Sequence, residues 1–202
     1  MSAEENMREP NEKHALVRQI LLHATAFPWT VATGHLTFIL EKDNVVLNVF
    51  DERFEQPWTK VHSHFLDFRS EIIAGEMVQI RYERSDRGGE GFQEHGFQQL
   101  TVANERLGTG TCYLRPGREE RYGAGEGYSI TAPEIHQVIP VDGTVTLVTR
   151  EFKTDPKSVF GFWRLPQEPS KPMIPFGAAA VETTVQEVIG LALEHLGEKV
   201  PW

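Results

Sequence analysis

The stretch from residue 35 to residue 150 alternates between short β-prone segments and turns. The segments are rich in β-branched and aromatic residues, and turn residues such as Lys42-Asp43-Asn44 and Asp142-Gly143 separate them. The predicted strands cover residues 36–41, 45–50, 59–66, 71–74, 77–83, 110–114, 128–131, 137–140 and 144–149. So many short strands predict an all-β sandwich or jelly roll.

Helical periodicity is found near both ends of the chain. Apolar residues recur at helical spacing over residues 12–26, and Pro28 cannot continue that helix. A second amphipathic pattern covers residues 183–197. We therefore expect one domain over residues 1–202, with a β core at about 35–165 and a helix on each side of it in sequence.

Two segments interrupt the strand pattern. Residues 85–99 contain four glycines and mixed charges, which is typical of a lid or of a loose surface hairpin. Residues 117–126 follow Pro116 and carry charges of both signs, which indicates a solvated hairpin. Neither segment is assigned to the core.

Charge and hydropathy limit the partners. Twenty Lys and Arg face 29 Asp and Glu, a net charge of -9, and no basic stripe offsets it, so nucleic acid is not expected as a ligand. No apolar run approaches the roughly 18 residues that span a bilayer, and the first residues lack the pattern of a secretory signal. Cys112 is the only cysteine, which fits a reducing compartment. We expect a cytoplasmic protein without membrane contact.

A His-x-His pair is the strongest chemical signal. In a strand, residues two apart project from the same face, so His62 and His64 can bind one ion. A second β-patterned block contains Gly127, Pro133 and His136, and supplies a third imidazole. The alternative is that these histidines are structural, as lone histidines usually are.

These two blocks resemble the two motifs of the cupin family. The first shares the His-x-His pair and Gly75, and the second shares the spacing from Gly127 to Pro133. The resemblance covers about residues 35–165, and the run His-x-His-x-x-Asp-Phe with a downstream Gly-Phe-Trp is similar to a bacterial branch related to cysteine dioxygenase. It implies a double-stranded β-helix with N-terminal and C-terminal helices, and a metal held by His62, His64 and His136.

The position that holds an acidic ligand in cupins is occupied by Phe68. A site of three neutral imidazoles can hold Fe(II), and also Zn or Ni. Asp67 and Glu71 are the carboxylates that can complete the site, but strand parity places both on the opposite face, so either needs a bulge to reach the ion. The alternative role of Asp67 is to orient an imidazole or to cap a turn.

Substrate contacts are sought on the strand over residues 77–83. Gln79 and Arg81 share one face of it, and if that face is inward, the Arg81 guanidinium can bind a substrate carboxylate. We accordingly assign Arg81 a catalytic role in substrate binding.

Two functions remain open. The first, implied by the resemblance, is an Fe(II)-dependent dioxygenase for a small thiol or an amino-acid-like substrate. The second is a non-catalytic cupin that binds or senses a small molecule, with a structural metal or none. An acidic jelly roll with amphipathic helices can also pair through a strand edge or a helix, so a homodimer is possible.

Overall fold

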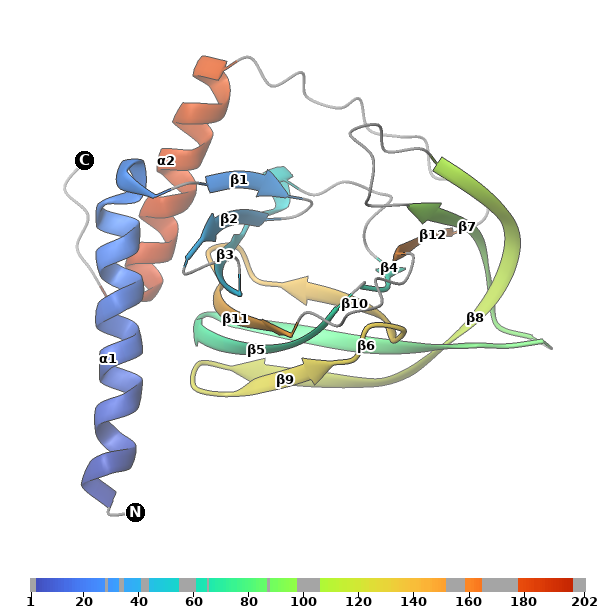
Figure 1. Cartoon of the computed structure of the whole chain (residues 1–202), viewed down its shortest axis with the longest axis horizontal. Coiled ribbons are helices and arrows are strands. Elements are labelled where there is room, and N and C mark those ends of the chain that lie inside the picture. The colour runs from blue at the N-terminus through green and yellow to red at the C-terminus, as the bar shows by residue number, and fades with distance from the viewer. Residues whose placement is uncertain are drawn as a thin grey trace.

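The computed structural model describes residues 3–27, 29–32, 35–40, 44–54, 61–64, 66–86, 88–97, 106–151, 159–164 and 178–197. Two helices lie side by side against one face of a β-sheet, and the remaining strands lie beyond its other face (Figure 1). The prediction of an all-β fold with a helix near each end is confirmed. None of the described helices is long and apolar enough to cross a membrane.

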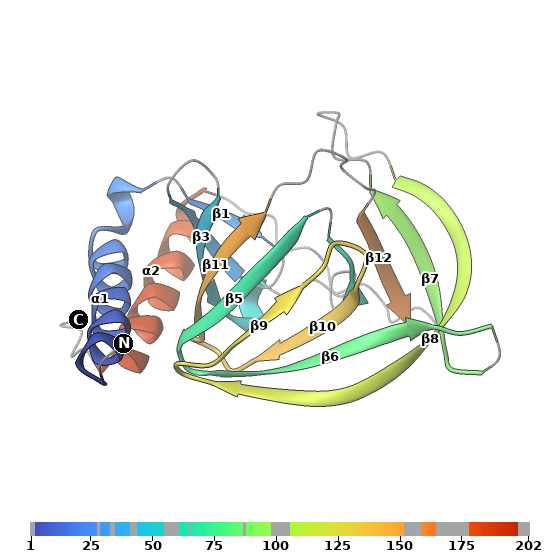
Figure 2. The ribbon, with the colours of Figure 1, turned by 60° about the horizontal axis from the view of Figure 1, so that its bottom comes forward.

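The strands form two antiparallel arrangements within the described residues. A six-stranded sheet contains, in spatial order, β1 (Trp29–Ala32), β2 (His35–Ile39), β3 (Val45–Phe50), β11 (Val145–Glu151), β5 (Asp67–Ala74) and β9 (Gly127–Ile130). The others pair in a closed ring, in the order β10 (Ile135–Pro140), β4 (Val61–His62), β12 (Val159–Arg164), β7 (Glu90–Phe97), β8 (Arg106–Gly123) and β6 (Glu76–Arg84). We call this ring the barrel. The barrel curls away from the sheet on the side opposite the helices (Figure 2).

The helices are longer at their N-terminal ends than predicted. α1 covers Ala3–Leu22 and is followed by a 3-10 turn over Ala24–Ala26, and α2 covers Ala178–His195. The prediction began the first helix at residue 12, where the helical spacing of apolar residues starts, two residues after Pro10. The structure continues the helix through this residue.

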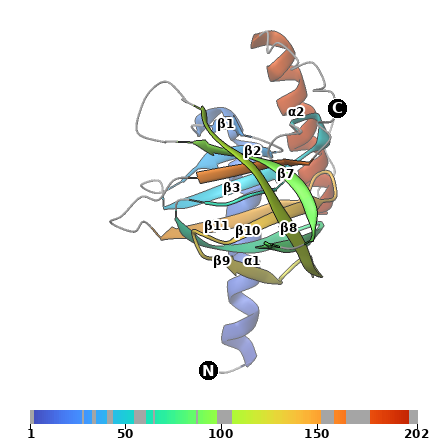
Figure 3. The same ribbon diagram turned by 90° about the vertical axis from the view of Figure 1, so that its right-hand side faces the viewer.

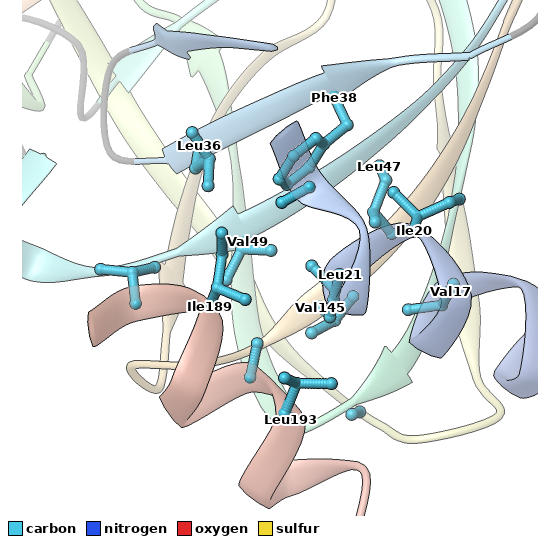
Figure 4. Packing of buried hydrophobic residues seen from close by; sticks show 14 of the residues in the cluster. Val17, Ile20, Leu21, Leu36, Phe38, Leu47, Val49, Val145, Ile189 and Leu193 are labelled. Carbon is cyan, nitrogen blue, oxygen red and sulfur yellow. The ribbon is translucent and has the colours of Figure 1, made fainter. Parts of the chain in front are cut away.

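Three hydrophobic clusters connect the layers. The first joins α1 and α2 to one face of the sheet, and Figure 4 shows Ile20, Ile189 and Val49 within it. The second lies between the other face of the sheet and the barrel and includes Phe68 and Met77. The third contains only side chains from barrel strands. The second cluster defines what we call the inter-sheet layer, and the candidate site borders it.

Several strands differ from the sequence-based prediction. β7 occupies most of the segment read as a lid or hairpin, and β8 is a single strand of 18 residues that runs through most of the second interruption. These polar, glycine-containing strands pair with each other antiparallel, with one register shift between Glu94 and His95, so long-range pairing rather than local apolar alternation makes them strands. Seen from the barrel side, β7 and β8 lie in front of the sheet (Figure 3).

The glycines of both motif-like blocks have a structural explanation. Gly75 has a φ of 80° in the turn between β5 and β6, where a side chain would be strained. A Cβ on Gly127 would lie 2.5 Å from the backbone oxygen of Ser70, because β9 packs tightly against β5 there. Both positions thus need glycine to shape the sheet.

Candidate metal centre

Three histidines from two parts of the chain meet at the edge of the inter-sheet layer. His62 on β4 pairs in register with His136 on β10, and His64 lies two residues after the end of β4. One ligand nitrogen from each of the three can be chosen so that all lie within 4.8 Å of one another. The ring centroids of the three pairs are 4.7, 4.9 and 5.0 Å apart. These histidines lie close enough to bind a single metal ion, as the two sequence blocks predicted.

Two of the rings face each other through the same ring atom. Nε2 of His64 lies 2.8 Å from Nε2 of His136, which is hydrogen-bond distance. Such a bond needs one ring to donate and the other to accept, so in this arrangement at least one Nε2 presents a lone pair. An ion placed between them would use both lone pairs and replace the shared proton.

The environment of His64 and of His136 favours the neutral form of both rings. His136 is 2% exposed, and burial lowers its pKa well below the usual 6.5, with the neighbouring histidines and Arg81 adding to the effect. Burial likewise lowers the pKa of His64 well below 6.5, with contributions from His62, His35 and Arg150. The neutral imidazole is the form that binds metals, so at pH 7 both rings are in the state that a ligand requires.

A short loop fixes His64 relative to His136. The backbone N–H of His64 donates to the carbonyl of Ala132 at 3.1 Å, and the N–H of Ala132 donates to Oδ1 of Asp67 at 2.8 Å. Glu134 accepts hydrogen bonds from the N–H and the hydroxyl of Thr131 at 2.6 and 2.7 Å. The loop between β9 and β10 therefore holds the chain around His64 and also leads into His136.

No carboxylate joins the three histidines in the described part of the chain. Glu71 forms an ion pair with Lys13 of α1 at 2.8 Å, and Asp67 accepts the Ala132 hydrogen bond. Each of these two acids thus has a partner other than an ion. Their positions are explained without the β-bulge that either would need to reach the histidines. Of the two roles considered for Asp67, the structure shows it capping this loop.

Phe68 is part of the wall of the site. Its ring centroid lies 4.7 Å from that of His64 and 6.2 Å from that of His136, in the inter-sheet layer. The prediction that residue 68 shares a face with the histidines agrees with these contacts. A phenyl ring supplies no ligand, so the donor set in the described residues consists of imidazoles.

Arg81 lies beside the site but already has protein partners. It is in register with His136 on the neighbouring strand, and its Nε donates to Oε1 of Glu134 at 3.2 Å. Nη1 contacts the carboxylate of Glu120, and Nη2 donates to the backbone oxygen of Ser129 at 3.1 Å. A substrate carboxylate would have to compete with these acceptors, and the catalytic role of Arg81 stays a prediction.

Sequence reasoning did not identify two contacts that shape the site. One is the link from His64 through the backbone of Ala132 to Asp67, which local residue spacing does not show. The other involves Gln79, whose Nε2 lies 3.5 Å from Nδ1 of His136. Strand alternation put Gln79 on the same face as Arg81 but left open whether that face is inward, and only the pairing of β6 with β10 brings Gln79 to the ring.

Comparisons with known proteins give no family. No family model matches the chain, and no curated protein matches it. Among solved structures, a chain from the crystal structure of Drosophila melanogaster CENP-C bound to CAL1 is similar over 70% of this chain and 98% of that one, with 11% identity and a TM-score of 0.38. So remote a likeness assigns no function, and the functional argument rests on the histidine cluster.

Proposed function

We propose that this chain is a cupin-type protein in which His62, His64 and His136 hold one divalent ion, and that the ion is Fe(II). The observation that carries the proposal is the convergence of three ligand nitrogens within 4.8 Å of one another. The lowered pKa of His64 and of His136 supports it, because protons do not compete for these rings at neutral pH. Zinc and nickel are the alternative ions, since imidazole binds all three.

We further propose a dioxygenase activity on a small thiol or an amino-acid-like substrate. Three protein ligands leave open positions on the ion, and Fe(II) there supplies the capacity to bind dioxygen next to a substrate. Phe68 would exclude water on one side of the site, because its ring packs against His64. Arg81 would hold an anionic group of the substrate, in exchange for one of its present carboxylate partners.

A second candidate is a non-catalytic protein that binds a small molecule or holds a structural ion. Two observations favour it. Arg81 contacts Glu120, Glu134 and the backbone of Ser129, and Phe68 and Met77 are packed into the inter-sheet layer. A buried ion without substrate access would then hold β4 and β10 together.

Oxygen consumption separates the two candidates. Protein purified without a histidine tag is loaded anaerobically with Fe(II), and oxygen uptake is recorded with cysteine, cysteamine and related small thiols. If the protein is a dioxygenase, we expect oxygen uptake that depends on the thiol and that His64→Ala abolishes. The control variant His14→Ala, which changes an exposed histidine, should retain this uptake. Full iron loading without uptake above the His64→Ala background would favour the non-catalytic candidate.

A further inference from the structure

Gln79 is a polar side chain in an apolar place. It lies on β6, is fully buried, and shares its face of the strand with Met77 of the inter-sheet layer. In register with it on β10 is Val138, which packs against the same layer. Burying an amide without full hydrogen bonding is unfavourable, so a glutamine here needs a specific reason.

Its polar contact points to the metal centre. The only hydrogen-bond partner that the described residues give the Gln79 amide is Nδ1 of His136, 3.5 Å from Nε2, and Oε1 has no partner among them. The oxygen and nitrogen of a side-chain amide have nearly the same shape and are assigned from their hydrogen bonds. Exchanging them places the carbonyl oxygen at Nδ1 of His136, where it can accept a hydrogen bond from an Nδ1–H group.

That orientation agrees with the other ring nitrogen. Nε2 of His136 lies 2.8 Å from Nε2 of His64, at the position where the ligand nitrogens converge. A neutral imidazole carries one proton, so a proton held on Nδ1 leaves the lone pair on Nε2. Metal-binding histidines usually donate their other N–H to an oxygen in this way, which sets the tautomer and the ring orientation.

We propose that Gln79 is a positioning residue that accepts a hydrogen bond from Nδ1–H of His136 and so directs the Nε2 lone pair of that ring toward the ion. The consequence for metal affinity rests on the proposed metal site. The tautomer itself does not, because it exists in the metal-free protein.

Two measurements test the proposal. Long-range ¹H–¹⁵N spectra of the metal-free protein report which nitrogen of His136 carries the proton, with the signals assigned by comparison with His136→Gln. Zn(II) affinity is then measured by competition with a chromophoric chelator for wild type, Gln79→Met, Gln79→Glu and Thr146→Val. Thr146 is an equally buried polar residue of the sheet with no described contact to the histidines, so its variant controls for loss of a buried polar atom.

The expected results differ from those of a Gln79 side chain that only fills space in the inter-sheet layer. In the wild type, His136 carries its proton on Nδ1. Gln79→Met loses this preference and weakens Zn(II) binding by about 10–100-fold, the range found when such outer partners are removed. Gln79→Glu, whose carboxylate can accept the same hydrogen bond, restores the affinity, and Thr146→Val leaves it unchanged.

Several results would overturn the proposal. Finding the proton of wild-type His136 on Nε2 would overturn it. This result needs only the wild-type protein, so it remains decisive even if the variants fail to fold. Wild-type affinity in Gln79→Met, or a loss in Gln79→Met that Gln79→Glu does not restore, would also overturn it. If the wild type binds no Zn(II), the proposed metal site fails, and the spectrum of His136 alone decides the role of Gln79.

Discussion

Both faces of the six-stranded sheet bury apolar side chains from the same strands, but the face toward the barrel also buries polar ones. Toward the helices, β2 and β3 present Leu36, Phe38, Leu47 and Val49, all fully buried. Toward the barrel, the alternate positions include Thr37 and Asn48, with Thr146 beside them on β11. On the facing strands β6 and β10 lie Gln79 and His136.

This difference suggests a division of roles. Apolar burial contributes roughly 25 cal/mol per Å2 and needs no partner, whereas each buried polar group must find a hydrogen bond to avoid a cost. The helix-facing side is therefore suited to holding the fold together. The barrel-facing side carries polar groups that weaken a core, and it is the side on which the histidines converge.

The largest expected effect is on the helix-facing side. Phe38→Ala should lower the free energy of unfolding by about 3–5 kcal/mol, because it leaves a cavity among fully buried neighbours. Urea unfolding measures this loss. Metal affinity, measured under conditions where the variant is folded, should stay at the wild-type value, and a weakened affinity would show that the two faces are not independent.

The pH dependence of stability should arise from the barrel-facing side. The pKa of His64 and of His136 is lowered by burial, so below about pH 6.5 the unfolded chain takes up protons that the folded protein does not. The stability present above pH 6.5 should therefore fall as the pH decreases, by up to about 1.4 kcal/mol per pH unit for each ring. Chemical unfolding of the metal-free protein at several pH values from about 7.5 down to about 5 measures this fall in the free energy of unfolding.

The control for this pH effect is the double variant His64→Gln/His136→Gln. Its stability should change less than that of the wild type over the same pH range. An equal slope in both proteins would place the titrating groups elsewhere.

Asp67 tests the loop that carries the site. Asp67→Ala leaves the N–H of Ala132 without its acceptor, which should cost about 1–3 kcal/mol of unfolding free energy. It should also weaken metal binding, because the carbonyl of the same residue holds His64. Asp67→Asn keeps an acceptor oxygen and should retain most of both. Loss of metal binding in Asp67→Asn with stability unchanged would instead indicate that the carboxylate is a ligand.

The smallest effect is expected from a matched pair of threonines next to Asn48. Thr37 donates from its hydroxyl to Oδ1 of Asn48 at 2.9 Å, whereas Oγ1 of Thr146 has no hydrogen-bond partner among the described residues. Thr37→Val should therefore destabilise the protein by about 1 kcal/mol, and Thr146→Val should be neutral or stabilising. Thermal unfolding of the two variants distinguishes them, and equal losses would contradict the hydrogen-bond assignment.

Local sequence patterns predicted those strands and helices whose own residues favour that structure. The strand at 45–50 was predicted with the bounds that β3 has, because all of its residues except Asn48 are β-branched or apolar and a turn pattern precedes it. β7 and much of β8 were not predicted, since glycine and charged residues become strands there only by pairing with each other. The ion pair between Glu71 and Lys13 joins a strand to a helix, so the spacing of residues along the chain cannot predict it.

The histidine cluster was predicted correctly for a partly wrong reason. The strand predicted at 59–66 would have aligned His62 and His64 by alternation, but β4 ends at His62. His64 reaches the cluster because the loop before β10 holds its backbone. The absence of a carboxylate at residue 68 was visible in the sequence, whereas the contact of Gln79 with His136 required the pairing of β6 with β10.

The most direct test of the account is metal content per chain in untagged protein. Wild type, His64→Ala and the exposed-residue control His14→Ala are purified alike and measured by plasma emission, after confirming by circular dichroism that each is folded. We expect one bound ion per chain, with iron as the metal found, in wild type and His14→Ala, and none in His64→Ala. A folded wild type that contains no metal and takes up none on titration with Fe(II) or Zn(II) would contradict it.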